Sequence, residues 1–150
     1  MKNLITLLLS FLALALPCKA DSAKTYTWRE TLDAIRVVET GGSPNEGVGV
    51  LGDGGAAAGP YQIHRIYHTD AAERDTTLTA YSKCLSSKAY SERVIDAYMG
   101  RYARAERDRL KRGVGTLADV EKIARIHNGG PRGHRKVATL HYWRKVSAQL

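Results

Sequence analysis

Eight glycines lie between Gly41 and Gly59, and this segment constrains the fold more than any other feature of the chain. Glycine weakens helices and adopts the positive φ angles of tight turns. We therefore expect a loop or a small β-hairpin here, with residues 48–51 paired to residues 61–63 across a glycine-rich turn. Because helical patterns flank this segment on both sides, the sequence predicts an α+β domain that is mostly helical, with a small β part.

Helix-start signals mark the rest of the chain. Thr27 and Glu30 form a predicted capping box, in which each side chain satisfies a free backbone N–H at a helix start, and Thr116 with Asp119 repeats it. Ser87 is a further candidate cap. The predicted helices cover about residues 28–40, 65–74, 88–112 and 117–128, and a last helix follows. Ile66 and Tyr67 are predicted to face inward from the second helix. The fourth helix should have Leu117, Val120, Ile123 and Ala124 on one face, and the last should carry Val137, Leu140, Trp143 and Val146.

Glu39 is an acidic residue on the apolar face of the first predicted helix. At about 100° per residue, Trp28, Leu32 and Ile35 form one stripe, and Glu39 projects into the middle of it. Because Gly41 stops the helix, Glu39 also lies in its last turn, where free carbonyls carry partial negative charge. Apolar surroundings and this helix end both disfavour the ionised carboxylate. Glu39 is therefore a candidate general acid, although an inward Glu paired with an arginine would serve structure alone.

Asp53 is the candidate partner of Glu39. It lies in the glycine-rich segment, which could fold back over the helix end and place Asp53 across a cleft from Glu39. Neighbouring glycine amides would keep its carboxylate ionised. Two carboxyl groups in opposite environments are the minimal equipment for glycoside hydrolysis. An Asp-Gly turn explains Asp53 equally well from the local sequence.

The first residues resemble a secretory signal peptide. An apolar run over residues 5–16 follows Lys2 and leads to small residues before Asp21. We expect cleavage near Ala20, a secreted or periplasmic product, and one catalytic domain over residues 21–150. The run is too short to span a membrane. Acylation of Cys18 in a lipoprotein is the alternative, disfavoured by Pro17 directly before it.

Charge and cysteine content limit the partners. The chain has a net charge of +8, which favours anionic partners such as wall polymers, nucleic acid or membrane surfaces. The basic run 107–112 fits a solvated helix end better than a nucleic-acid site, because no aromatic residues interleave with it. Without Cys18, only Cys84 remains, so packing alone must hold the domain. His64 and His68 have zinc-like spacing but lack the accompanying Glu, so no metal or cofactor is expected.

Several motifs together resemble one family, the invertebrate-type or destabilase-like lysozymes. The matching runs follow the family's order along nearly the whole of the predicted mature chain. The His-Asn-Gly-Gly-Pro run is the most specific of them. Many family cysteines are replaced here, as by Ala58 before Gly59, so the chain looks like a disulfide-poor member. The matching runs are residues 38–41, 59–63, 98–103, 124–133 and 142–143.

The resemblance implies a lysozyme-like fold, with the glycine-rich region beside an active-site cleft. It implies a secreted muramidase that cleaves the β-1,4 bond between N-acetylmuramic acid and N-acetylglucosamine in peptidoglycan, with retention. Glu39 and Asp53 match the catalytic acid and its partner. Expected substrate contacts are Tyr61, Gln62, His127, Asn128 and Gly129. A lytic transglycosylase and a non-catalytic glycan-binding module are the competing hypotheses; oligomeric state is left open.

Overall fold

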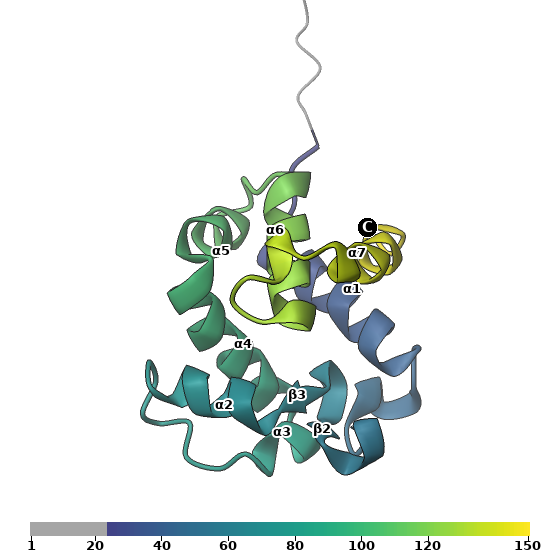
Figure 1. The fold of residues 1–150 in the computed structure, drawn as a ribbon, viewed down its shortest axis with the longest axis vertical. Coiled ribbons are helices and arrows are strands. Elements are labelled where there is room, and N and C mark those ends of the chain that lie inside the picture. Colours follow the sequence, from purple (N-terminus) through teal and green to yellow (C-terminus); the bar gives the residue numbers. More distant parts are fainter. Residues whose placement is uncertain (1–23) are drawn as a thin grey trace, which may run out of the picture.

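The computed structural model describes residues 24–150, which form seven α-helices and a small antiparallel sheet that lies at one end of the molecule, beside α2 and α3 (Figure 1). The predicted signal peptide over residues 1–20 and Cys18 lie outside the described residues. The helices are α1 (Trp28–Thr40), α2 (Arg65–Ala72), α3 (Lys83–Ser86), α4 (Lys88–Tyr102), α5 (Arg104–Lys111), α6 (Leu117–Gly129) and α7 (Leu140–Ser147), and the strands are β1 (Leu51–Gly52), β2 (Ala57–Ala58) and β3 (Ile63–His64). The expected mostly helical α+β fold is confirmed.

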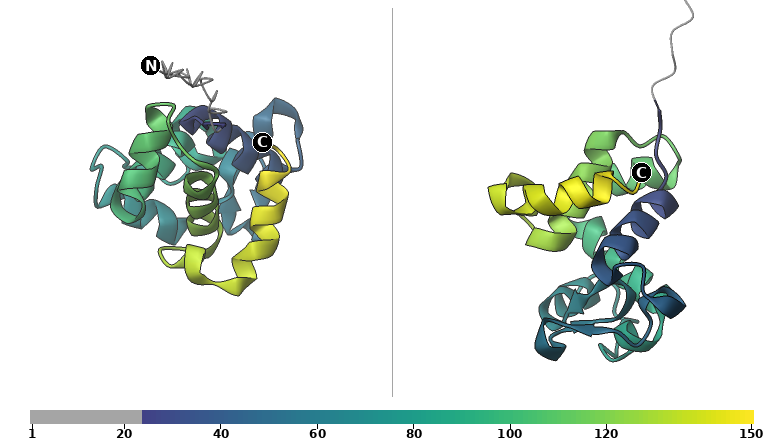
Figure 2. Two further views of the ribbon diagram at one scale, coloured as in Figure 1. Left: turned by 90° about the horizontal axis from the view of Figure 1, so that it is seen from above. Right: turned by 90° about the vertical axis from the view of Figure 1, so that its right-hand side faces the viewer.

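The molecule has a helical part and a mixed part. In the helical part α6 packs against both α5 and α7, and α1 contacts α5 and α7. In the mixed part α2 and α3 lie beside the sheet and pack on α4. Figures 1 and 2 show α1 and α4 running from one part into the other. The end of α1 therefore reaches the glycine-rich segment that follows it.

Apolar side chains of these helices meet in one core. The inward faces of α1, α4 and α6 supply half of its buried residues, and Leu110 of α5 and Val146 of α7 also pack into it. Cys84 is a free thiol within this core, and burial raises its pKa to about 12, so the thiolate is not available near neutral pH. No helix within residues 24–150 is long and apolar enough to cross a membrane.

Both predicted capping boxes are present. Thr27 accepts from the Glu30 amide and Glu30 accepts from the Thr27 amide; Thr116 and Asp119 do the same at the start of α6. Ser87 caps α4 as predicted, accepting from the Tyr90 amide. Asp119 has an additional partner, because the Arg109 guanidinium of α5 donates to both of its carboxylate oxygens. The α6 cap therefore also ties α6 to α5.

Replacing Asp119 by Asn should destabilise the domain in a pH-dependent way. The hydrogen bond from Arg109, with those from Thr116, lowers the pKa of Asp119 from 3.8 to about 2 in the folded protein. A lowered folded-state pKa stabilises above the unfolded value, and that stabilisation is lost as the pH falls from 3.8 through 2. We expect a loss of about 2 kcal/mol at pH 7 by urea unfolding, shrinking below pH 4. If wild type and variant differed in free energy of unfolding by the same amount at pH 7 and at pH 2, the lowered pKa of Asp119 would not explain the loss.

The predicted hairpin is wrong in its pairing. Residues 48–51 and 61–63 do not pair directly, because β2 lies between β1 and β3. Leu51 is opposite Ala58, and Ala58 is in turn opposite Ile63. Alanine gives little strand signal, but at this position its small side chain packs at the centre of the sheet, where Ala57 and Ala58 are buried. The sheet is thus one strand wider than the sequence indicates.

Four helix predictions also need correction. The long helix predicted over 88–112 breaks at Ala103, whose φ and ψ of −149° and 45° are not helical. The break turns α5 toward α6 and brings Leu110 into the core. Ile66 and Leu117, predicted to face inward, are 81% and 46% exposed. Val137 lies before α7 and is 81% exposed, since the last helix starts at Leu140.

Candidate active site

Glu39 faces inward from the last turn of α1, as its position in the apolar stripe predicts. Its side chain is only 17% exposed. Gly41 ends the helix in the left-handed conformation, with φ of 58°. The Tyr142 hydroxyl of α7 donates to Glu39 Oε1 over 2.7 Å. Glu39 Oε2 accepts no hydrogen bond from the described part of the chain, so it is the oxygen left for a substrate.

Tyr142 is a strong candidate for orienting this acid. Burial, followed by the neighbouring charge of Glu39, raises the pKa of the Tyr142 hydroxyl well above its usual range. The hydroxyl therefore stays protonated and keeps donating over the whole range in which carboxyl groups titrate. One oxygen of Glu39 is fixed by this contact, which orients the other.

His127 of α6 is the second group beside Glu39. Its Nε2 lies 3.1 Å from the Tyr61 carbonyl oxygen and 3.4 Å from Glu39 Oε1. Because a carbonyl only accepts, Nε2 carries the hydrogen, and the Tyr67 hydroxyl lies 3.5 Å from Nδ1 on the other side of the ring. His127 thus connects α6 to the loop before β3 and presents an N–H to Glu39.

Asp53 follows β1 in a much more open environment. Its side chain is 70% exposed, and its Oδ2 lies 3.0 Å from His64 Nε2. The expected glycine amides do not donate to its carboxylate; the imidazole at the end of β3 is its partner instead. Asp53 also starts a turn, with its carbonyl accepting from the Ala56 amide and a φ of 49°. Asp53 therefore forms the Asp-Gly turn with its backbone while its carboxylate faces the cleft.

These groups line a single polar cavity of about 320 Å³. Glu39 and Asp53 both line it, from α1 and from the turn after β1. A largely buried carboxyl group and an exposed one thus face a common space. The lining residues are Glu39, Asp53, Ala57, Gln62, His64, His127 and Asn128.

Of the predicted substrate contacts, Gln62, His127 and Asn128 line this cavity. Asn128 is exposed, so its amide is free for a ligand. The Gln62 side chain donates to the Gly59 carbonyl over 2.9 Å, and a Cβ at Gly52 would lie 1.9 Å from its Oε1. Gln62 therefore braces the turn that carries Asp53, and Gly52 is needed for this close approach.

Tyr61 and Gly129 do not take the predicted positions. The prediction that the Tyr61 side chain contacts the substrate is wrong, because its ring is fully buried and its hydroxyl donates to Glu92 over 2.8 Å. The backbone carbonyl of Tyr61 still contributes, by accepting from His127. Gly129 is outside the cavity lining; its carbonyl accepts from Lys136, and a Cβ there would meet Thr139.

Comparison with known proteins shows the family to which the chain belongs. The sequence profile described as Destabilase matches residues 30–149. The chain belongs to the destabilase family, the invertebrate-type lysozymes. The Crassostrea virginica protein named Lysozyme 1 is 39% identical over 93 residues, covering 62% of this chain and 45% of that protein. Invertebrate-type lysozyme 6 of Caenorhabditis elegans is 32% identical over 133 residues, covering 83% and 88% of the two chains.

The fold agrees with the family at the level of solved structures. The crystal structure of Aeromonas hydrophila PliI in complex with Meretrix lusoria lysozyme contains a chain that superposes with a TM-score of 0.60 and 28% identity. The superposition covers 85% of this chain and 93% of that one. The chain spans less than two thirds of the oyster lysozymes, 45% of the Crassostrea and 60% of the Magallana gigas protein. The lysozyme-like fold is thus confirmed.

The sequence does not indicate the roles of two residues of the site. Tyr142 lies in a family-like Tyr-Trp pair, but no local pattern indicates that it bonds a residue 103 positions earlier. The spacing of His64 from His68 suggests only a zinc ligand. The two imidazoles have different partners, since His68 Nε2 lies 2.9 Å from the Tyr90 hydroxyl. Residues 24–150 contain no group of three or more His, Cys, Asp or Glu arranged to hold a metal.

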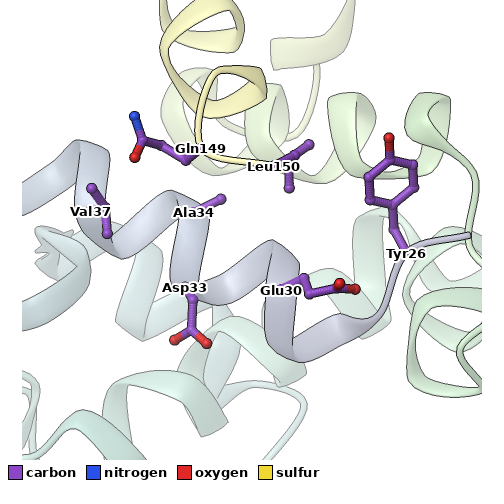
Figure 3. Close-up of a pocket in the computed structure, with 7 residues that line it drawn as sticks. All are labelled: Tyr26, Glu30, Asp33, Ala34, Val37, Gln149 and Leu150. Carbon is purple, nitrogen blue, oxygen red and sulfur yellow. The ribbon is translucent and has the colours of Figure 1, made fainter. Parts of the chain in front are cut away.

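A second depression lies between α1 and the C-terminal segment, and it is lined by Tyr26, Val37 and Leu150 among others (Figure 3). It contains two acids, but Glu30 is engaged in the α1 capping box. Figure 3 shows the Asp33 carboxylate pointing away from Gln149 and Leu150. This depression therefore lacks a facing pair of carboxyl groups.

Proposed function

We propose that this protein hydrolyses the β-1,4 bond between N-acetylmuramic acid and N-acetylglucosamine in peptidoglycan, with retention of configuration. The observation that carries the proposal is the shared cavity of Glu39 and Asp53, in which one carboxyl group is largely buried and the other is exposed. Relatives named lysozymes and the family membership support the same reaction class.

Glu39 is the general acid in this proposal. Tyr142 and His127 both approach Oε1, so Oε2 carries the proton into the cavity. Glu39 donates this proton to the glycosidic oxygen as the bond to the anomeric carbon breaks, and the leaving sugar departs as an alcohol. Glu39 is then a carboxylate, ready to act as a base.

Asp53 stabilises the positive charge that develops at the anomeric carbon, either by covalent attack or as a nearby anion. His64 holds one oxygen of Asp53, which leaves the other facing the sugar. In the second half-reaction Glu39 removes a proton from water, and the water oxygen bonds to the anomeric carbon on the face that the first sugar left. Where Asp53 has attacked covalently, its bond to the anomeric carbon breaks in this step and Asp53 leaves as a carboxylate. The products are two saccharides, with the original configuration at the new reducing end.

Product analysis tests this proposal. After digestion of peptidoglycan, mass spectrometry should find reducing muramic ends that carry one added water, and early NMR spectra should show the β-anomer. Ends lighter by one water, the anhydro products of a lytic transglycosylase, would overturn the hydrolase assignment. An initial α-anomer would instead exclude retention. A transglycosylase does not require the Asp53 carboxylate, which is why the paired site favours hydrolysis.

Secretion belongs to the same proposal. We infer that residues 1–20 direct export and that cleavage occurs near Ala20, from the apolar run and the small residues before Asp21. Export would bring the enzyme to its polymeric substrate. N-terminal sequencing of the exported product checks the cleavage position.

A further inference from the structure

Four arginines line a second polar cavity, of about 330 Å³, that the proposed hydrolysis does not use. Arg74 follows α2, Arg93 belongs to α4, and Arg104 and Arg107 belong to α5. None of the residues that line this arginine cavity lines the cavity of Glu39 and Asp53. It is therefore a separate concavity with a strongly basic wall.

Two of the four guanidinium groups are fixed by the protein. Arg107 donates to Asp108 over 3.0 and 2.8 Å and to the Asp96 carbonyl over 3.1 Å, and its side chain is 19% exposed. It lies directly over Gly100, where a Cβ would be 2.4 Å from its Nη1. Arg93 donates to Asp75 over 3.1 Å. These two arginines form a rigid basic surface.

The guanidinium groups of Arg74 and Arg104 have N–H donors that are not hydrogen-bonded within the described residues. Within residues 24–150, Arg74 makes no side-chain hydrogen bond or ion pair. Arg104 has one weak ion pair, 3.8 Å from Asp108, and its side chain is 76% exposed. Each guanidinium carries five N–H donors. Arg74 and Arg104 thus present guanidinium N–H donors that are available to a ligand, from two different segments at the rim of the arginine cavity.

The two acids of the cavity cancel only part of the charge of its four arginines. Asp75 is bonded to Arg93, and Asp96 accepts from Lys111 over 2.7 Å and lies 3.8 Å from Arg107. With both carboxylates already paired, the free donors favour an anion rather than a cation. A planar carboxylate matches one guanidinium fork, whereas the oxygens of a phosphate point in several directions and can meet two forks at once.

We propose that the arginine cavity binds a phosphate group of an anionic polyol-phosphate polymer, and that Arg74 and Arg104 supply the ligand contacts. Arg74 and Arg104 are both exposed, so a polymer bound to them can continue past the cavity into solvent. No aromatic side chain lines it, so it has no stacking surface for nucleic-acid bases. That the polymer belongs to a bacterial wall rests on the proposed function; the binding itself does not. The site would hold the enzyme near its substrate.

The test is binding of the full chain to a fluorescent poly(glycerol phosphate) oligomer, measured by anisotropy. The Arg74→Gln/Arg104→Gln variant should bind at least about tenfold more weakly than wild type, because two charge-assisted contacts are lost. The matched control is Arg132→Gln/Arg144→Gln, which removes the same charge from exposed residues outside the cavity and should change the Kd less than about threefold.

Three outcomes would overturn the proposal. The first is that wild type does not bind the oligomer, and the second is that the two double variants bind it equally weakly. The third is that an oligonucleotide with the same number of phosphates binds wild type as tightly as the oligomer does and loses as much affinity in the cavity variant. Hydrolysis of a soluble peptidoglycan fragment that carries no polyol phosphate should be the same in wild type and cavity variant. If that hydrolysis is absent from wild type, the proposed function fails while the binding result stands.

Discussion

The Glu39→Gln variant is expected to lose about 10³-fold in the rate of wall-suspension clearing, because an amide cannot transfer a proton to the glycosidic oxygen. The substitution changes little else. Glutamine has the same shape, and its amide oxygen can still accept from the Tyr142 hydroxyl, which lies 2.7 Å from Oε1 in the wild type. Binding of the glycan should therefore persist, so the loss should appear in kcat rather than in KM.

Two comparisons make this result specific. Glu46→Gln, in the loop after α1 and outside the catalytic cavity, should clear walls at the wild-type rate. Both variants should show the wild-type circular dichroism spectrum. Equal clearing by wild type and Glu39→Gln would remove Glu39 from the role of acid. If neither protein clears walls but both bind them, the chain is a glycan-binding module.

The Asp53→Asn variant is expected to lose about 10²- to 10³-fold in kcat, because a neutral amide cannot stabilise or attack the positive anomeric centre. The fold should be unaffected, since the side chain is 70% exposed and makes only one hydrogen bond, to His64. Reaction rates on a soluble glycan oligomer at saturating concentration measure this loss directly.

The His64→Gln variant tests how much of the effect of Asp53 depends on its orientation by His64, because it leaves the charge of Asp53 unchanged. Glutamine can still donate to Asp53 Oδ2, so we expect at most about a tenfold loss in kcat, well below that of Asp53→Asn. Asp33→Asn, an exposed acid of α1 outside the catalytic cavity, serves as the control and should be fully active. A full-rate Asp53→Asn enzyme would leave Glu39 as the only catalytic carboxyl group.

The sequence predicted the features that depend on local geometry. The helical period placed Glu39 on the inward face of α1, and the two capping boxes located the starts of α1 and α6. Glycine content located the irregular β region that carries Asp53. Each of these rests on residues within one helix or one turn, whose spacing is fixed by the backbone.

Features that depend on packing between distant segments were not predictable. No local signal marks Ala103 as the end of α4; the break is set by the packing of α5 on α6. Tyr61 has the aromatic ring expected of a sugar contact, but its ring is buried and its hydroxyl donates to Glu92 of α4, which is partly buried. His64 gains its role only because β3 runs beside β2, which brings it to Asp53.

The hydrogen bond between Tyr142 and Glu39 joins residues 103 positions apart in the sequence. During synthesis the ribosome releases α1 long before α7 exists, so a nascent chain contains the acid without the hydroxyl that orients it. Docking of α7 completes the site in the same event that buries Val146. An unfinished or misfolded chain would therefore be a poor enzyme, and full activity would report that both ends of the domain have folded together.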